Sequence, residues 1–442
     1  MRSKLHFYIA LFSMLLFLAG TCPAQAMNLA AAEFPGLTDI GNQGTLPEIT
    51  GTAAILIDAD SGQVLYEKNA HDRRFPASTT KIMTALLAIE NLDMEAVITA
   101  DAEAASMTGS RIHLAEGEQV KTLDLLYALM VESANDSAVA LGKAVSGTVT
   151  DFAALMTKRA AEVGALNTQF TNTNGLPDEN HYTTAYDLAM ITKAAFAHQL
   201  FREVAATPAY TIPATNLREA REMKNSNLML WDDEVRTDEN GTQYMLKYEG
   251  TNGVKTGHTN AAGYCLVASV NRDGHELIGV VLGAAEWMHF SDMHRIMDYG
   301  FGAYDSVVLV GTESLDKKVK VKRGELRKIP VILKKDLRVS LPAGTEPEKV
   351  EVELTLEKKY EAPVAQNQTL GKAEIFYNGK LLTTENVVAG QESPLREGID
   401  IVGILLAVLK YGGIGAAILI VLYALFAFGV NRIYQRKKKK RK

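Results

Sequence analysis

Cysteine is scarce in this sequence, because only Cys22 and Cys265 occur among its 442 residues. Cys22 falls within an apolar leader, so a chain cleaved after Ala26 would retain one cysteine and could form no disulfide within itself. Cys265 lies in the apolar, β-type run of residues 263–270, where a thiol is most often a small core residue. We therefore expect no cysteine chemistry.

The sequence also lacks the patterns of several other function classes. It contains neither His-Glu-x-x-His nor Gly-x-Ser-x-Gly, which mark zinc peptidases and α/β-hydrolases. His289 and His294 are five residues apart on an expected helix with no matching third ligand, and we expect them at the surface. The formal net charge is −6, and no basic stripe with interleaved aromatic residues precedes the C-terminus. We therefore expect no metal, no cofactor and no nucleic-acid partner.

The N-terminus has the pattern of a secretory signal. Two basic residues precede an apolar run at 9–18, and Ala24-Gln25-Ala26 follows as an Ala-x-Ala cleavage site. This predicts a signal peptide over residues 1–26 and an exported protein. Cys22 leaves a lipoprotein signal as an alternative, although Thr21 before it fits such a site poorly. Residues 27–45 are rich in turn formers and predict a linker.

The C-terminus has the pattern of a membrane anchor. Residues 414–430 carry no charge, and residues 399–409 are apolar apart from Asp400. A cluster of lysine and arginine follows at the very end. Such a segment, closed by basic residues, predicts a transmembrane anchor over 398–430 and a cytoplasmic tail over 431–442. The alternative, an amphipathic helix lying in the membrane interface, is less favoured because the apolar run surrounds the whole helix.

Between the two ends, strand-like runs flank a helical middle. A turn at 58–62 joins two short apolar runs into a hairpin, helical signals dominate 91–199, and strand patterns return only from Gly250. This predicts an α/β (α+β) domain over 46–305, in which an antiparallel sheet assembled from both sequence ends carries a helical insertion. The expected strands are 53–57, 63–67, 253–257, 262–270 and 276–283, followed by a helix at 289–299.

The segment 306–397 changes character. Short β-branched runs alternate there with glycine, proline and charged residues. This predicts a small all-β domain that acts as a spacer or docking module. The expected strands are 307–310, 318–321, 329–333, 337–340, 350–356 and 372–377.

The first candidate for chemistry is Ser78 with Lys81. Phe75-Pro76-Ala77 precedes them and an apolar run follows, so a helix should begin near Ser78. Residues three apart share a helix face, which places the hydroxyl beside the amine. The pair is reactive only if burial or a second cation lowers the pKa of Lys81. Alone, a capping serine and a surface lysine would be the commoner explanation.

Two further motifs supply what this pair requires. Ser133-Ala134-Asn135 follows a helix at a loop junction, where the hydroxyl can relay a proton and the amide can hold a substrate carbonyl. Lys255-Thr256-Gly257 lies on a strand, where Lys255 is the second cation and Gly257 lets a substrate backbone approach closely. Taken singly, these are a capping turn and an edge lysine.

Together and in this order, the three motifs are the signature of penicillin-binding proteins and serine β-lactamases. The sequence resembles the low-molecular-mass penicillin-binding proteins, the serine-type D-alanyl-D-alanine carboxypeptidases, over roughly residues 46–304. Beyond the three motifs, the resemblance rests on the stretches Asn174-Gly175-Leu176-Pro177, Thr184-Ala185-Tyr186-Asp187-Leu188-Ala189 and Gly253-Val254-Lys255-Thr256-Gly257-His258-Thr259.

The resemblance implies a role for each motif. Ser78 would attack the carbonyl between two D-alanines and become an acyl ester, with Lys81 as general base and Ser133 as proton relay. Asn135 would contact a substrate amide, and Lys255 would recognise the terminal carboxylate and keep Lys81 neutral. The substrate would also bind along the strand that contains Thr256, Gly257 and His258. The N–H groups of Ser78 and His258 would form the oxyanion hole.

The same resemblance implies the partners. The substrate would be a peptidoglycan stem pentapeptide ending in D-Ala-D-Ala, β-lactams would act as inhibitors, and no cofactor would take part. The anchor would hold the enzyme on the outer face of the bacterial cytoplasmic membrane.

Three alternatives are open. A β-lactamase needs a carboxylate to activate the deacylating water, but the candidate Glu162 has one residue too many before Asn167 and falls on a solvated helix face. An endopeptidase cutting D-alanine cross-links would use the same motifs. A catalytically inactive wall-binding protein is disfavoured because every reactive position is filled.

Overall fold

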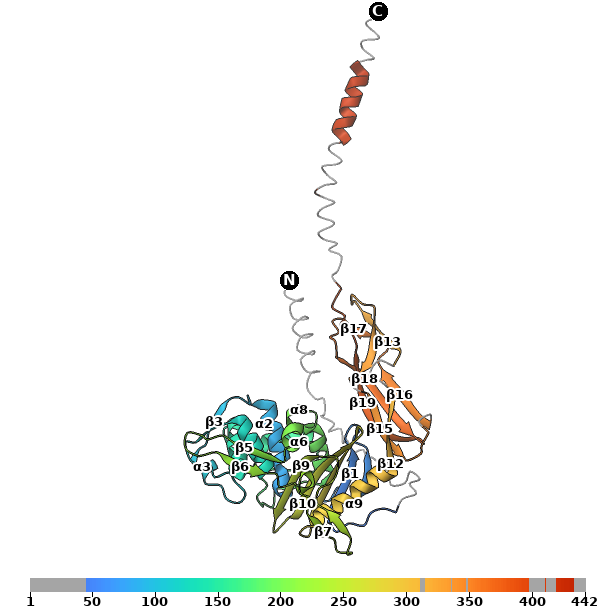
Figure 1. The fold of residues 1–442 in the computed structure, drawn as a ribbon. Helices are drawn as coiled ribbons and strands as arrows, with labels where there is room; N and C mark the ends of the chain where they lie inside the picture. Colours follow the sequence, from blue (N-terminus) through green and yellow to red (C-terminus); the bar gives the residue numbers. More distant parts are fainter. Residues whose placement is uncertain are drawn as a thin grey trace, which may run out of the picture. The chain divides into compact units, whose positions relative to one another are not determined.

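The structure is a computed structural model that describes residues 45–310, 315–334, 336–346, 349–396, 410 and 419–432. The chain divides into two compact units, Met1–Asp305 and Ser306–Lys442 (Figure 1). The expected signal peptide at 1–26 lies outside the described residues. So do nearly all of the expected linker at 27–45 and most of the expected anchor and tail.

A five-stranded antiparallel sheet forms the centre of the first unit, in the order β2-β1-β11-β10-β9. β1 and β2 come from the beginning of the unit and β9 to β11 from its end, so the expected assembly from both sequence ends is confirmed (Figure 1). β9 is an edge strand. The bounds are β1 Ala53–Asp58, β2 Val64–Lys68, β9 Thr251–Thr259, β10 Gly263–Arg272 and β11 His275–Ala284.

Helices cover both faces of this sheet. Ile278, Val280 and Leu282 of β11 join the hydrophobic core that also contains helices α2 and α7. Gly279 faces the other way, where a side chain would meet Met293 of α9. The bounds are α2 Lys81–Asn91, α3 Ala102–Ala105, α4 Thr122–Tyr127, α5 Asn135–Ser146, α6 Val149–Glu162, α7 Ala185–Ala195, α8 Gln199–Ala205 and α9 Met288–Ala303.

The expectation that strands return only from Gly250 is wrong. Three two-stranded antiparallel sheets lie among the helices or before β9. They were missed because strands of three or four residues are too short to show a period-two pattern. They are β3 Val97–Thr99 with β4 Gln119–Lys121, β5 Ala209–Ile212 with β6 Arg221–Lys224, and β7 Val235–Thr237 with β8 Gln243–Met245.

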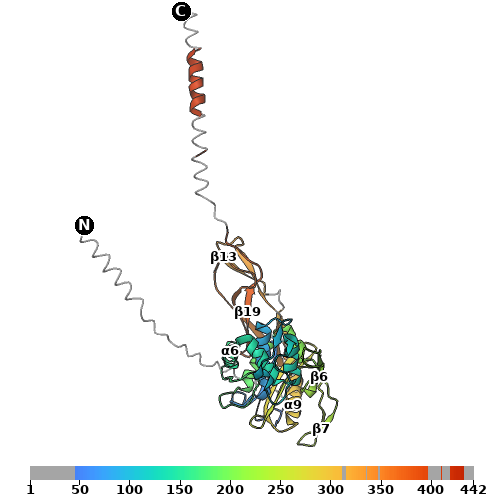
Figure 2. The ribbon, with the colours of Figure 1, turned by 90° about the vertical axis from the view of Figure 1, so that its left-hand side faces the viewer.

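The second unit is all-β in its described globular part, as expected. A six-stranded sheet has the order β16-β18-β19-β14-β13-β17, and β12 pairs with β15. Figure 2 shows β13 and β19 of the larger sheet from a second side. The sequence missed β17 and the ten-residue β19, whose central Thr-Thr-Glu-Asn interrupts the apolar pattern. The bounds are β12 Tyr304–Val310, β13 Lys317–Lys322, β14 Lys328–Leu333, β15 Leu337–Pro342, β16 Val350–Leu356, β17 Tyr360–Glu361, β18 Thr369–Tyr377 and β19 Lys380–Ala389.

Within the described residues, no single helix is both long enough and apolar enough to cross a membrane. A shorter apolar helix spans Leu419–Arg432. Helices α5 and α6 together are long and apolar enough to cross a membrane, but they are bent by 82° relative to each other. Helix α5 is also a core helix of the first unit.

Candidate active site

Ser78 lies in a 3₁₀ turn, Ala77–Thr80, that leads directly into α2. In a 3₁₀ turn the side chains at positions i and i+3 eclipse each other, which brings Ser78 over Lys81. The Lys81 Nζ atom lies 2.8 Å from Ser78 Oγ. Ala77 has a positive φ of 47°, an uncommon conformation for a residue with a side chain, and such strain concentrates at functional sites.

The other neighbours of Lys81 orient its amine. Nζ lies 2.8 Å from Asn135 Oδ1 and 2.8 Å from the carbonyl oxygen of Asn174. Both oxygens only accept hydrogen bonds, so a neutral amine must give them its two N–H groups. Its lone pair is then left facing Ser78. In the neutral state Ser78 therefore donates its hydroxyl proton toward Lys81, which is the arrangement a general base requires.

The electrostatic surroundings favour that neutral state. Lys81 is fully buried, and burial is the main cause that lowers its pKa well below the ordinary lysine value. The Lys255 ammonium lowers it further, while the carboxylate of Asp136 acts in the opposite direction. Asp136 is itself buried and accepts hydrogen bonds from the backbone N–H groups of Ile112 and Leu114.

The second motif lies where one helix ends and another begins. Helix α4 continues into a π-helical turn, Ala128–Glu132, and Ser133 follows with a left-handed φ of 64°. Asn135 then begins α5. Its Nδ2 donates to the carbonyl of Thr108 at 2.7 Å, which fixes the amide so that Oδ1 points to Lys81. The structure thus gives Asn135 a positioning contact that its motif alone did not indicate.

The third motif lies on the edge strand β9. Lys255 is fully buried, with Nζ 3.2 Å from the carbonyl of Thr256 and 3.4 Å from Ser226 Oγ. Burial lowers the pKa of Lys255 to about 7, and the nearby Glu132 carboxylate opposes that shift. The Thr256 hydroxyl lies 2.6 Å from Ser226 Oγ. Ser226 is a member of this polar cluster that sequence reasoning missed, because no motif marks it.

The turn that carries Ser78 requires a glycine at position 257. A Cβ atom at this position would lie 2.9 Å from the backbone nitrogen of Ser78. We expected the glycine to admit a substrate backbone, whereas the contact present in the structure is with the Ser78 turn. This closeness places the Ser78 N–H beside the strand that continues into His258.

Sequence reasoning also missed that the segment 171–181 packs against the Ser78 turn and helix α2. The Thr84 hydroxyl donates to the carbonyl of Thr173 at 2.6 Å, and Thr80 Oγ1 lies 2.8 Å from His181 Nε2. The backbone N–H of Thr171 donates to His181 Nδ1, so a neutral ring carries its proton on Nε2 and donates to Thr80. Burial lowers the pKa of His181 to about 4, which favours the neutral ring.

A cavity of about 440 Å³ opens over these residues. It is lined by Ser78, Ser133, Thr256, Gly257 and His258, so five of the eight predicted site residues border one space. The other three, Lys81, Asn135 and Lys255, lie beneath it, linked to that lining by the contacts described above.

Aromatic side chains form one wall of this cavity. The rings of His258 and Tyr264 are 4.1 Å apart, and those of Tyr264 and His289 are 5.2 Å apart. The expectation that His289 and His294 lie at the surface is wrong. His289 is 5% exposed, and His294 is half-buried against Tyr248, because this face of α9 packs on the neighbouring strands and loops.

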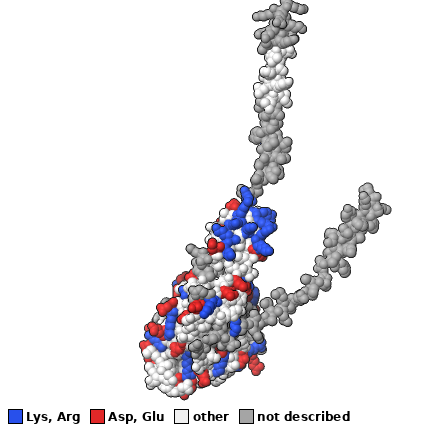
Figure 3. All heavy atoms as spheres, turned by 90° about the vertical axis from the view of Figure 1, so that its right-hand side faces the viewer, with Lys and Arg blue, Asp and Glu red and all other residues white. Residues whose placement is uncertain are grey.

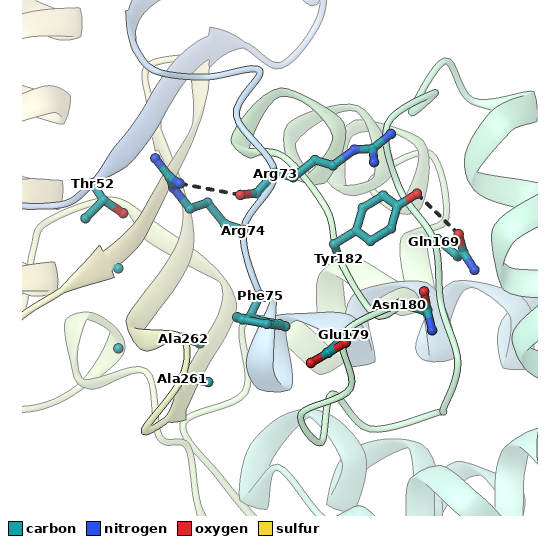
Figure 4. A pocket seen from close by; sticks show the side chains of 12 residues that line it. Thr52, Arg73, Arg74, Phe75, Gln169, Glu179, Asn180, Tyr182, Ala261 and Ala262 are labelled. Carbon is teal, nitrogen blue, oxygen red and sulfur yellow. Dashed lines mark hydrogen bonds between the residues drawn. The ribbon is translucent and has the colours of Figure 1, made fainter.

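A larger hollow of about 810 Å³ contains none of the motif residues. Figure 4 shows Arg73 over the ring of Tyr182, whose hydroxyl donates to Gln169 at 3.2 Å. Among the described residues that line this hollow there is no nucleophile beside a base, so the volume of a hollow does not by itself identify the reactive site.

Neither Cys265 nor Glu162 has catalytic surroundings. Cys265 is fully buried and its thiol pKa is raised to about 11, which confirms a core residue. The Glu162 side chain is 48% exposed and pairs with Arg159, which confirms its place on a solvated helix face. In the part of the chain that the structure describes, no three His, Cys, Asp or Glu residues gather as metal ligands would.

A buried lysine oriented toward a serine at the start of a helix defines a serine hydrolase of the Ser-x-x-Lys type. Residues 41–286 match the family model described as D-alanyl-D-alanine carboxypeptidase, and residues 304–394 match that of the penicillin-binding protein 5 C-terminal domain. The chain belongs to the D-alanyl-D-alanine carboxypeptidase family and is a serine-type carboxypeptidase.

Individual relatives agree with this assignment. The chain is 33% identical over 352 residues to D-alanyl-D-alanine carboxypeptidase DacF of Bacillus subtilis, covering 78% of this chain and 86% of the relative. It is 29% identical to DacC of Escherichia coli, with coverages of 78% and 86%. Among solved structures, penicillin-binding protein 5 from Haemophilus influenzae superposes with a TM-score of 0.62 at 26% identity, covering 79% of this chain and 99% of that one.

Proposed function

We propose that the enzyme removes the terminal D-alanine from peptidoglycan stem pentapeptides through an acyl ester on Ser78. The observation that carries this proposal is the environment of Lys81, whose two acceptor neighbours leave its lone pair for the Ser78 hydroxyl. In the first step Ser78 Oγ attacks the carbonyl between the two D-alanines while Lys81 takes its proton. The N–H groups of Ser78 and His258 stabilise the negative oxygen that forms.

The following steps return the proton and release the product. Ser133 relays the proton to the leaving amine, the C–N bond breaks, and free D-alanine departs. Water then attacks the ester, giving the shortened peptide and restoring the Ser78 hydroxyl. Lys255 attracts the terminal carboxylate, which binds next to Thr256, and Asn135 contacts a substrate amide.

β-Lactams fit the same scheme as inhibitors. Attack by Ser78 on the lactam carbonyl opens the ring and forms the same kind of ester. Among the described residues that line the cavity, Glu132 and Glu286 are the only carboxylates. Glu162, the residue considered for a β-lactamase, is not among them. Because Glu132 and Glu286 do not belong to the pattern that the β-lactamase alternative requires, the proposal expects a long-lived adduct with penicillin and only slow hydrolysis of the drug.

We further propose the domain and membrane layout. A signal peptide over 1–26 directs export, and a linker over 27–45 precedes the catalytic domain at 46–305 and the β domain at 306–397. An anchor over 398–430 holds the enzyme at the outer face of the cytoplasmic membrane, with the tail over 431–442 inside. The uncharged run at 414–430 and the apolar helix Leu419–Arg432 support the anchor. A mature N-terminus at Met27 would support the cleavage site.

Mass spectrometry of a synthetic stem pentapeptide tests the reaction. The full chain should release a single alanine from a peptide ending in D-Ala-D-Ala, and the Ser78→Ala variant should release none. An unchanged peptide would contradict carboxypeptidase action. Cleavage of a cross-linked dimer alone would instead identify an endopeptidase.

A further inference from the structure

One end of the β unit carries a concentrated positive charge. Figure 3 shows lysine and arginine side chains gathered there. Nine of the described residues line a groove of about 500 Å³ at this end, and all of them except Val321 and Gly324 are basic. We call the seven others the basic tip: Lys320, Lys322, Arg323, Arg327, Lys328, Lys359 and Arg396.

Most of these charges have no ion-pair partner among the described residues. Within the described residues, Glu361 pairs with Lys322 and Arg323, and no other member of the basic tip forms an ion pair. Lys320 and Lys328 also stand directly opposite each other in the antiparallel pairing of β13 with β14. Like charges in that position destabilise a hairpin. An external anion bound at the basic tip would offset this repulsion.

Apolar side chains accompany the charge. Leu326 and Leu395 are 42% and 53% exposed. They lie at the same tip, because Gly324 bridges to Leu395 and the N–H of Arg396 donates to the carbonyl of Arg323. Exposed leucines among lysines and arginines are typical of a surface that inserts into a membrane interface. A purely polar polyanion would gain nothing from them.

The position of the basic tip along the chain also indicates a membrane surface as its partner. Arg396 belongs to the basic tip, and the apolar run begins only three residues later, at Ile399. Three residues span at most about 10 Å, which is close to the Debye length at physiological ionic strength. If the proposed anchor enters the bilayer there, the basic tip lies within electrostatic range of the lipid headgroups.

We propose that the basic tip binds the anionic phospholipid headgroups of the membrane that holds the anchor. The lysines and arginines contact the headgroup phosphates, and Leu326 and Leu395 enter the interface between them. This inference rests on the proposed anchoring for its geometry, and it is independent of the catalytic chemistry.

Fluorescence quenching of a label on the basic tip tests the proposal. The full chain carries Leu326→Cys in a Cys22→Ser background, so that an apolar thiol-reactive fluorophore labels one site while the buried Cys265 stays unreactive. The protein is reconstituted into phosphatidylcholine vesicles, with or without phosphatidylglycerol, that contain a quencher lipid. A Lys349→Cys label is the control, since the seven residues of β16 separate position 349 from Lys359 by roughly 20 Å.

We expect strong quenching at position 326 only with phosphatidylglycerol, reduced by high salt, and none at position 349. Lys328→Glu should return quenching to the neutral-lipid level without lowering the melting temperature, because the new carboxylate faces Lys320 across the hairpin. The matched Lys349→Glu change should leave the quenching unaltered.

The other outcomes overturn the proposal in distinguishable ways. Equal quenching in both lipids would show that charge plays no part. If the chain stays on the vesicles without quenching, the proposal that the basic tip binds headgroups is refuted and the proposed anchor is retained. If the chain binds neither kind of vesicle, both the headgroup binding and the anchor are refuted. A label that responds only to added soluble polyphosphate would make the partner a free polyanion.

Discussion

A Cβ atom at Gly175 would lie 1.7 Å from the carbonyl oxygen of Ala77. Gly175 also has a φ of +91°, a conformation that only glycine adopts easily. The segment that begins at Asn174 is therefore pressed against the turn that carries Ser78. Since the Asn174 carbonyl also accepts from Lys81, one segment supports the Ser78 turn and orients the Lys81 amine.

Gly175→Ala should damage catalysis more than stability. The methyl group must displace the Ala77 turn, and a shift of about 1 Å at a nucleophile can cost roughly 100-fold in rate. The positive φ adds about 1–2 kcal/mol of strain. Penicillin acylation kinetics and denaturant unfolding measure the two effects.

Gly302→Ala is the matched control, because Gly302 is an exposed residue of α9 with nothing within 4 Å of its added Cβ. It should leave acylation unchanged and keep or slightly raise stability. A Gly175→Ala enzyme with normal acylation would refute the supporting role of this segment.

Sequence reasoning identified the motifs because their chemistry is local. Ser78 and Lys81 are three residues apart, and the order of the β1–β2 hairpin, helices and β9 to β11 follows from hydrophobic periodicity. A reactive lysine needs its pKa lowered, so the Ser78–Lys81 pair itself predicts a second cation, which Lys255 provides.

The site residues that sequence reasoning missed are brought together by contacts between distant parts of the chain. The Asn174 carbonyl is a backbone atom, and nothing in a sequence shows which carbonyl meets a distant amine. Ser226 and His181 are ordinary residues until β9 and α2 bring partners to them. β19 was missed because its bulged pairing and polar centre hide the alternation.

In the pH profile of the acylation rate, Lys255→Met should move the acid limb, where the rate falls as Lys81 is protonated, to higher pH. The Lys255 ammonium helps to lower the Lys81 pKa, so its removal lets Lys81 hold its proton to a higher pH. Rates of labelling by a fluorescent penicillin from acidic to alkaline pH measure this. Lys224→Met is the control, because Lys224 lines the same cavity but is not among the charges that shift Lys81. An unmoved limb in Lys255→Met would contradict the coupling.

Asp136→Asn should move the same limb in the opposite direction. The Asp136 carboxylate raises the Lys81 pKa, so its neutralisation lets Lys81 lose its proton at lower pH. The variant should also lose about 1–3 kcal/mol of unfolding free energy, because an amide cannot satisfy all the backbone N–H groups that the carboxylate accepts. Shifts of the two variants in one direction would be inconsistent with this electrostatic account.

The stability of the first unit should depend on pH through Lys255. Its pKa is about 7 when folded, against an ordinary lysine value of 10.5. The unfolded chain therefore binds more protons between these values, and the unfolding free energy rises as the pH increases from about 7 to about 10. The full cost of burying the charge applies below pH 7. Denaturant unfolding of Lys255→Met should show a shallower rise, because the buried Lys81, whose pKa is also lowered, still contributes to it. An identical slope in both proteins would exclude Lys255 as a source of the rise.

The central claim, that Ser78 is the nucleophile activated by a neutral Lys81, is tested most directly by locating the covalent adduct. The full chain is incubated with penicillin, digested, and its peptides are sequenced by mass spectrometry. The account predicts one penicilloyl group, carried by Ser78, with labelling lost in Ser78→Ala and strongly slowed in Lys81→Met. An adduct on Ser133 or any other residue, or undiminished labelling of Ser78→Ala, would contradict it.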